Sequence, residues 1–282
     1  MKVLFMGTPE FAVGTLKALI KSSHAVVGVV TQPDRSVKHG KTEEGAVKKV
    51  ALAAGIPVFQ PCRIRNEVDE IKRFDADIAV TAAYGQILTA EVLDAFKYGV
   101  INVHASLLPK YRGASPIQAA IAAGETETGV TIMRTELGID TGDILAVAKT
   151  PIGERETAGE LSARLSDLGA ELLVKTLDEF DKIVPIKQNN ELATHCKMIS
   201  KQELYIDFTA DCRDVANKIR ALSPLPCAKT VIGGETYKIH EAVAISDHAA
   251  ANRAVAGSII RADDKLIVAC GSGAVEIITI QA

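Results

Sequence analysis

The stretch INVHASLLP, residues 101–109, predicts an apolar strand that breaks into a turn beside an amide, an imidazole and a hydroxyl. Asn102 and His104 occupy alternate positions, so an extended chain places both side chains on one face. Ligands of open α/β sheets bind beyond the carboxyl ends of the strands, and we therefore expect this pair to face a site. An amide donates hydrogen bonds to a developing oxyanion, and an imidazole transfers protons near neutral pH. The pair favours acyl-type transfer over hydride or phosphoryl chemistry.

Strand-like and helix-like segments alternate on the N-terminal side of this stretch. Strands are predicted at residues 2–6, 25–31, 56–59, 76–82 and 98–103, and helices at 10–21 and 43–54. We expect Pro9 to open the first helix behind a Thr8 cap. This alternation predicts a Rossmann-like parallel sheet with helices on both faces. The first turn lacks the G-x-G-x-x-G pattern of dinucleotide sites, so the sheet is not expected to bind a nucleotide.

A carboxylate follows in the segment LGIDTGDI, residues 137–144, where Asp140 lies between strand-like runs at 129–135 and 143–151. Taken alone, a polar pair at a strand end is also explained by a turn cap, and Asp140 by an ordinary hairpin turn. The two segments together are more specific than either one. A helix is predicted at 115–123, and a long helix at 157–182 begins with the capping-box pattern Thr157-Ala158-Gly159-Glu160.

The pattern of predicted elements changes after a polar stretch that has no hydrophobic periodicity. Residues 187–204 are expected to be a linker between a catalytic domain, 1–186, and a C-terminal domain, 205–282. The latter has a predicted helix at 211–222 and five short strand-like runs, at 228–232, 236–245, 256–262, 266–270 and 275–280. Turn residues such as Gly233-Gly234 separate them, which predicts a small OB-like β-barrel.

The composition indicates which other classes of protein the chain does not resemble. The 282 residues carry 32 Lys and Arg against 35 Asp and Glu, so the net charge of −3 makes no global case for nucleic acid. Six basic or histidine side chains nevertheless gather within residues 35–49. No apolar run approaches the length of a membrane span. The five cysteines are scattered and show neither a metal pattern nor a disulfide framework, which favours a reducing cytoplasm.

The motifs around Asn102 and Asp140 together resemble those of the formyltransferases that use 10-formyltetrahydrofolate. The resemblance extends over nearly the whole chain, and it narrows to the methionyl-tRNA formyltransferases. The matching segments are Met6–Ala12, Thr31–Arg35, Pro57–Pro61, Ala83–Leu88 and, in the small domain, Arg220–Pro226.

The resemblance implies roles for particular residues. It makes Asn102, His104 and Asp140 the catalytic trio, with no metal. It assigns contact with 10-formyltetrahydrofolate to two segments, Gly85, Gln86, Ile87 and Leu88, and Ser106, Leu107, Leu108 and Pro109. It assigns contact with methionyl-initiator tRNA to Arg35, Lys38, His39, Lys41 and Arg220. His39 stands where the family has an arginine, so Lys38 or Lys41 is expected to supply a phosphate contact. We expect a cytoplasmic monomer with no membrane partner.

Three alternatives share parts of this pattern. A formyltransferase acting on a sugar-nucleotide amine would keep the trio but would not need the segment Arg220–Pro226. A 10-formyltetrahydrofolate hydrolase would use the same trio with water in place of the amine. A non-catalytic RNA-binding module is disfavoured because the complete trio is present.

Overall fold

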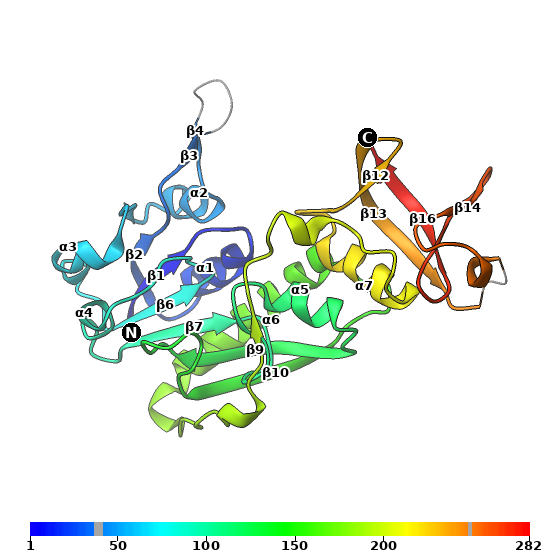
Figure 1. Cartoon of the computed structure of the whole chain (residues 1–282). Helices are drawn as coiled ribbons and strands as arrows, with labels where there is room; N and C mark the ends of the chain where they lie inside the picture. The colour runs from blue at the N-terminus through cyan, green and yellow to red at the C-terminus, as the bar shows by residue number, and fades with distance from the viewer. Residues whose placement is uncertain (37–41, 248–249) are drawn as a thin grey trace. The chain divides into compact units, whose positions relative to one another are not determined.

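Residues 1–36, 42–247 and 250–282 are described by the computed structural model, and they group into two units (Figure 1). Unit 1 comprises Met1–Arg112, Gly129–Lys149 and Ala163–His195. Unit 2 comprises Gly113–Thr128, Thr150–Ser162 and Cys196–Ala282. Within these ranges, no helix combines the length and apolar character that a bilayer crossing requires.

Seven of the described strands form one sheet, in the order β10-β9-β7-β6-β1-β2-β5. They are β1 (Lys2–Gly7), β2 (Ala25–Val30), β5 (Val58–Phe59), β6 (Ile78–Ala82), β7 (Val100–His104), β9 (Glu127–Arg134) and β10 (Ile144–Pro151). Neighbouring strands from β5 to β7 run parallel, whereas β9 runs antiparallel to β7. The predicted Rossmann-like sheet is confirmed, and its direction reverses beside the strand that carries Asn102 and His104.

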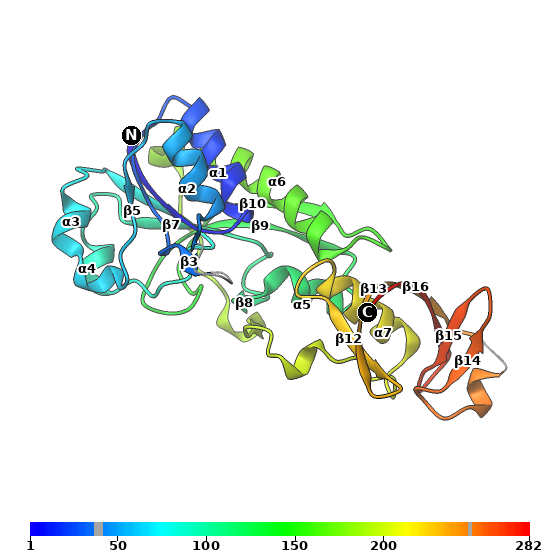
Figure 2. The ribbon, with the colours of Figure 1, turned by 90° about the horizontal axis from the view of Figure 1, so that it is seen from above.

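Helices cover both faces of this sheet. They are α1 (Phe11–Lys21), α2 (Ala46–Ala53), α3 (Val68–Lys72), α4 (Ala90–Leu93) and α6 (Ala158–Asp178). Figure 2 shows α1 and α6 on one face and α3 and α4 on the other. The hydroxyl of Ser166 donates to the Phe11 carbonyl at 2.7 Å, which ties α6 to α1.

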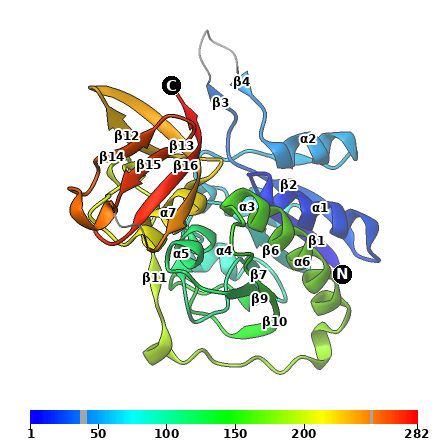
Figure 3. The same ribbon diagram turned by 90° about the vertical axis from the view of Figure 1, so that its right-hand side faces the viewer.

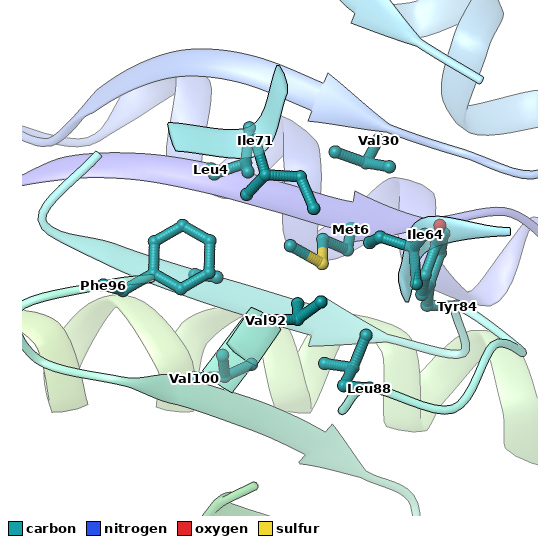
Figure 4. Packing of buried hydrophobic residues seen from close by; sticks show 11 residues of the cluster. Leu4, Met6, Val30, Ile64, Ile71, Tyr84, Leu88, Val92, Phe96 and Val100 are labelled. Carbon is teal, nitrogen blue, oxygen red and sulfur yellow. The ribbon is translucent and has the colours of Figure 1, made fainter. Parts of the chain in front are cut away.

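A hydrophobic cluster fixes the face covered by α3 and α4 (Figure 4). Leu4 and Met6 of β1 lie there because alternate strand residues share a face. Ile71 of α3, Val92 of α4 and Val100 of β7 complete its centre. Burial of each such side chain contributes about 1.5–3 kcal/mol. This packing holds the strands whose carboxyl ends carry the polar residues.

The start of α1 differs from the prediction. The helix begins at Phe11, and Pro9 precedes it without occupying the first helical position. The Thr8 hydroxyl oxygen instead accepts a hydrogen bond from the Gln32 amide at 3.2 Å, so this side chain bridges two loops and does not cap the helix.

The ends of α6 give mixed outcomes. The predicted capping box is confirmed, because Glu160 N donates to Thr157 Oγ1 and Thr157 N donates to Glu160 Oε2. The helix ends at Asp178, before the predicted end at residue 182. A 3₁₀ turn, η3 (Phe180–Lys182), follows it, and there Phe180 packs edge-on against Tyr98 with ring centroids 5.7 Å apart.

Unit 2 contains a curled antiparallel sheet of order β12-β13-β16-β15-β14 (Figure 3). The strands are β12 (Ala228–Ile232), β13 (Glu235–Ile245), β14 (Ile259–Ala262), β15 (Leu266–Ala269) and β16 (Ala274–Gln281). Val215 and Ile219 of α7 (Cys212–Leu222) pack against the sheet in the unit's core. Gly233 and Gly234, at φ 60° and 88°, form the predicted hairpin turn, and the OB-like architecture is confirmed.

Shorter elements complete the described chain. They are α5 (Pro116–Ala122), which packs on α7, the paired strands β3 (Arg35–Ser36) and β4 (Thr42–Glu43), the paired strands β8 (Arg112–Gly113) and β11 (His195–Cys196), and the 3₁₀ turns η2 (Ile64–Asn66), η4 (Asn190–Leu192), η5 (Gln202–Leu204) and η6 (Ala251–Arg253).

Candidate active site

His104 is the last residue of β7, and its side chain is only 5% exposed. Its Nε2 atom lies 3.0 Å from the carbonyl oxygen of Tyr111. Because a carbonyl only accepts hydrogen bonds, Nε2 carries a proton in this arrangement. The Nδ1 atom lies 3.6 Å from Oδ2 of Asp140. Nδ1 is therefore the ring nitrogen that can exchange a proton, and it faces a carboxylate.

Asn102 lies two residues before His104 on β7, and it is half-buried. The Thr81 hydroxyl of β6 lies 2.8 Å from Asn102 Oδ1 and 3.2 Å from the Ile101 carbonyl oxygen. A hydroxyl has one proton to donate, and the shorter contact directs it to the Asn102 amide oxygen. The amide nitrogen of Asn102 is therefore the end left to donate to a ligand.

Asp140 reaches His104 from the connection between β9 and β10. Its backbone φ is 50°, a left-handed conformation that asparagine and aspartate adopt more readily than most residues. A Cβ at Gly142 would lie 2.0 Å from the Arg134 carbonyl oxygen, so only glycine fits there. Gln188 Nε2 donates to the carbonyl oxygens of Asp140 and Gly142, at 2.9 and 2.7 Å.

The segment Ser106–Pro109 is held by internal hydrogen bonds. Ser106 is fully buried, and its hydroxyl donates to the Lys110 carbonyl at 2.6 Å. The Thr131 hydroxyl of β9 donates to the Ser106 carbonyl and accepts from the Leu108 amide. These contacts fix the shape of the turn after β7, and they leave the Ser106 hydroxyl engaged within the protein.

In the loop Gly85–Leu88, the side chain of Gln86 is held by hydrogen bonds, whereas that of Ile87 is exposed. Gln86 Oε1 accepts from the Ile64 amide at 2.8 Å, and its Nε2 donates to the Pro61 carbonyl at 3.0 Å. Leu88 points into the hydrophobic cluster, whereas Ile87 is 86% exposed. Ile87 is thus the side chain of this loop that is free to meet a ligand.

A cavity of about 510 Å³ lies beside the connection that carries Asp140. Residues 134–138, leading towards Asp140, form one wall, and Leu93 and Val100 add apolar surface to the other. The Thr135 hydroxyl oxygen is buried and has no hydrogen-bond partner among the described residues. The cavity therefore combines apolar surface with the charged residues Asp94, Arg134 and Glu136.

The residues expected to contact RNA are spread over both units. Arg35 lies in β3, whose backbone pairs with Glu43 of β4. Lys38, His39 and Lys41 lie outside the described residues. Arg220 of α7 donates through Nε to Asn217 Oδ1 and through Nη1 to the carbonyls of Gly153 and Glu156. Burial lowers the pKa of the Arg220 guanidinium.

The comparisons with known proteins cover both units. Residues 1–177 match the formyl transferase family, and residues 198–282 match the formyl transferase C-terminal domain. The methionyl-tRNA formyltransferase of Lachnospira eligens is 49% identical over 86% of this chain and 78% of its own. That of Chromobacterium violaceum is 42% identical over the whole of this chain and 92% of its own.

The chain belongs to the methionyl-tRNA formyltransferase family. It is accordingly an enzyme of formyl transfer, as the sequence motifs predicted.

Solved structures agree with this fold. An N-formyltransferase from Helicobacter canadensis, in complex with folinic acid and dTDP-3-aminofucose, superposes over the whole of both chains with a TM-score of 0.74 and 22% identity. HypX from Aquifex aeolicus, in complex with tetrahydrofolic acid, gives a TM-score of 0.67 and 15% identity over 99% of this chain and 44% of its own. These likenesses concern the fold alone.

The structure brings Asn102, His104 and Asp140 of the formyltransferase to one strand end. Among the described residues, no group of three or more His, Cys, Asp or Glu side chains is arranged to hold a metal ion. The sequence interpretation missed Thr81, Gln188 and the cavity walls. Apolar residues in the glycine-bounded loop around Asp140, such as Leu137, were the available signal for the cavity.

Proposed function

We propose that this chain transfers the formyl group of 10-formyltetrahydrofolate to the α-amine of methionyl-initiator tRNA. The observation that carries the proposal is the convergence of Asn102, His104 and Asp140 at the carboxyl end of β7, in a chain whose relatives are methionyl-tRNA formyltransferases. The amine nitrogen attacks the formyl carbon, a tetrahedral intermediate forms, and the bond between that carbon and the folate nitrogen breaks. The amine loses a proton, and the departing folate nitrogen gains one.

Asn102 is proposed to stabilise the oxyanion of the intermediate. Its amide oxygen accepts from Thr81, so its N–H groups are the part of the amide left to donate to the oxyanion. A donor fixed in advance stabilises developing charge without having to reorganise during the reaction. The proposal therefore depends on Thr81 as well as on Asn102 itself.

His104 and Asp140 are proposed to move both protons as one unit. The Tyr111 carbonyl engages Nε2 of His104, and the remaining ring nitrogen faces the Asp140 carboxylate at 3.6 Å. The proton taken from the amine and the proton given to the folate nitrogen are both transferred by the Asp140 carboxylate and Nδ1 of His104. General acid–base groups of this kind contribute about 10²–10⁴-fold to a rate.

The cavity of about 510 Å³ is proposed to receive the pterin ring of 10-formyltetrahydrofolate. Pockets for small ligands are mainly apolar with a few placed polar groups, and this cavity has that composition. The backbone of residues 136–138 in its wall offers donors and acceptors to the ring edge. Gly85–Leu88 and Ser106–Pro109 are proposed to contact the remainder of the cofactor, Ile87 through its exposed side chain.

Contact with tRNA is proposed for Arg35, Lys38, His39 and Lys41, on and between β3 and β4. The base of this ribbon is fixed, because Asp34 accepts hydrogen bonds from Lys48 at 2.5 Å and from Gln60 at 2.8 Å. Figures 1 and 3 show β3 and β4 beyond α2, away from the sheet of unit 1.

Arg220 is proposed to contact RNA through Nη2, since its other N–H groups bind within unit 2.

Incubation of the purified chain with 10-formyltetrahydrofolate and methionyl-initiator tRNA tests the proposal. We expect formyl-methionyl-tRNA to accumulate, detected after mild hydrolysis of the ester by mass spectrometry. Release of free formate without tRNA would favour the hydrolase. Formylation of an aminosugar nucleotide in preference to the tRNA would favour the sugar-nucleotide enzyme.

A further inference from the structure

Arg112 is a buried arginine next to the active site that the mechanism above does not use. It is 4% exposed at the start of β8. Its Nε and Nη2 atoms both donate to Oε1 of Gln188, at 3.0 and 2.7 Å. Nη2 also donates to Oδ1 of Asn190 at 2.8 Å. A planar guanidinium holds such an acceptor in one orientation, which an ammonium group does not.

Gln188 uses the other end of its amide on the Asp140 connection. Its Nε2 atom donates one hydrogen bond to the carbonyl of Asp140 and one to that of Gly142. With two bonds accepted at oxygen and two donated at nitrogen, the amide has its full complement of partners. Arg112 thus fixes which end of the amide faces Asp140.

Residues 188–194, the segment that contains Gln188, also hold the backbone on the Nε2 side of His104. The Tyr111 amide donates to the Thr194 hydroxyl at 2.8 Å, and the Arg112 amide donates to the Thr194 carbonyl at 2.9 Å. Tyr111 supplies the carbonyl that engages His104 Nε2. Residues 188–194, expected from the sequence to be a linker, therefore contact both backbone segments that flank the imidazole.

The Asp140 connection has little packing of its own to hold it. Leu137 and Ile139 are 71% and 69% exposed, so their burial contributes little. The left-handed φ of Asp140 also costs free energy, which the surroundings must offset. The Arg134 amide closes the base of the connection by donating to the Asp143 carbonyl at 2.9 Å, and the two hydrogen bonds from Gln188 hold its backbone at Asp140 and Gly142.

We propose that Gln188, oriented by Arg112, is a positioning residue that keeps the Asp140 carboxylate beside His104 Nδ1. The inference deepens the proposed function, because it concerns the same proton-transferring pair. It predicts that Gln188 acts on catalysis only through Asp140.

The test compares Gln188→Met with Gln202→Met, a matched change on the exposed turn η5. We expect Gln188→Met to lower kcat about 10- to 100-fold, as a displacement of a reacting group by about 1 Å does, while KM for methionyl-tRNA changes little. Gln202→Met should match the wild type. Hydrogen exchange at the amides of residues 137–143 should become faster in Gln188→Met alone.

A double-mutant cycle separates positioning from a merely structural role. In an Asp140→Asn background, Gln188→Met should have no further effect on kcat, because the carboxylate that it positions is absent. Multiplicative losses, or an unchanged exchange rate at 137–143, would overturn the inference. Failure of the wild type to formylate methionyl-tRNA would refute the proposed function instead, and the exchange experiment would still test the brace.

Discussion

Polar groups are arranged in opposite ways around the candidate active site of unit 1 and a cavity of unit 2. At the end of β7, His104 and Arg112 are almost fully buried, and each has hydrogen-bond partners at fixed distances. In unit 2, a cavity of about 790 Å³ between α7, β13 and residues 152–160 has charged walls. Arg155 pairs there with Glu241, and their side chains remain 65% and 45% exposed. The first arrangement is suited to orienting reacting groups, whereas the second leaves the Arg155–Glu241 pair in contact with water.

This difference bears on what each region can do. Buried donors and acceptors act strongly because little water competes with them, and they need no reorganisation during a reaction. Exposed ion pairs contribute little on their own, but exposed basic groups still bind phosphates. We therefore expect changes near β7 to alter the chemical step by large, coupled factors, and changes in unit 2 to alter stability and binding by small, additive ones.

The largest effect is expected at the proton-transferring pair. His104→Asn and Asp140→Asn should each lower kcat about 10²–10⁴-fold. The double variant should lose far less than the product of the two, because residues that act as a unit are non-additive. Single-turnover rates with saturating substrates provide the measurement. Fully multiplicative losses would show that the two residues act in separate steps.

Asn102→Ala should lower the chemical rate about 10²–10³-fold, as the loss of one oxyanion donor does. Affinity for a folate analogue, measured by calorimetry, should stay close to that of the wild type. A single-turnover rate within a few-fold of the wild type would rule out the oxyanion role.

Thr81→Val should lower the rate by about tenfold, corresponding to a loss of roughly 1.4 kcal/mol of transition-state stabilisation. Valine keeps the shape of threonine but lacks the hydroxyl that orients the Asn102 amide. Thr81→Ser is the control and should retain most of the activity. Equal rates for the valine and serine variants would show that the amide needs no such orientation.

Arg220→Met tests unit 2 on two scales. Loss of its hydrogen bonds to Asn217, Gly153 and Glu156 should lower the free energy of unfolding by about 1–3 kcal/mol, measured by urea denaturation. The plot of log K for tRNA against log salt should have a wild-type slope of roughly −4 if about five phosphates are contacted, and a slope less steep by about 1 in the variant. An unchanged slope would confine Arg220 to a bracing role.

The smallest effect is expected at the base of the β3–β4 ribbon. The hydrogen bonds from Lys48 and Gln60 hold the pKa of Asp34 below its usual value. Such a carboxylate stabilises the fold above its unfolded pKa, and this contribution is lost as pH falls through the folded value. Asp34→Asn should therefore unfold at lower temperature than the wild type near pH 7. The difference in melting temperature should close below about pH 4; a gap independent of pH would contradict this origin.

The contrast between the two regions also explains how far sequence interpretation reached. Asn102, His104 and Asp140 could be proposed as site residues from the sequence because they lie in two short motifs, one at the end of a strand and one in a loop between strands. Four strands of unit 2 were predicted within one residue at each end, since paired turn residues such as Gly233 and Gly234 mark their limits, whereas β14 begins at Ile259, three residues after its predicted start. Both are local signals.

What escaped prediction depends on contacts between distant segments. Gln188 lies 48 residues from Asp140 in the sequence, and its stretch is polar and aperiodic, so it resembled a linker. Thr8 preceded a proline in a sequence typical of a helix cap, but the tertiary contact with the Gln32 amide took its hydroxyl instead. Local propensity has no access to such partners.

The antiparallel pairing of β9 with β7 sets a limit on how this site can vary. Thr131 lies opposite His104, and Arg134 lies opposite Ile101, so β9 leads away from the imidazole. The connection after Arg134 must return along β7 by three residues, roughly 10 Å, before Asp140 reaches His104. A one-residue deletion between 135 and 139 would shorten that reach and abolish catalysis while leaving the sheet intact. A substitution at Ile139, which is 69% exposed and does not line the cavity, preserves the reach, so chain length is constrained more tightly there than residue identity.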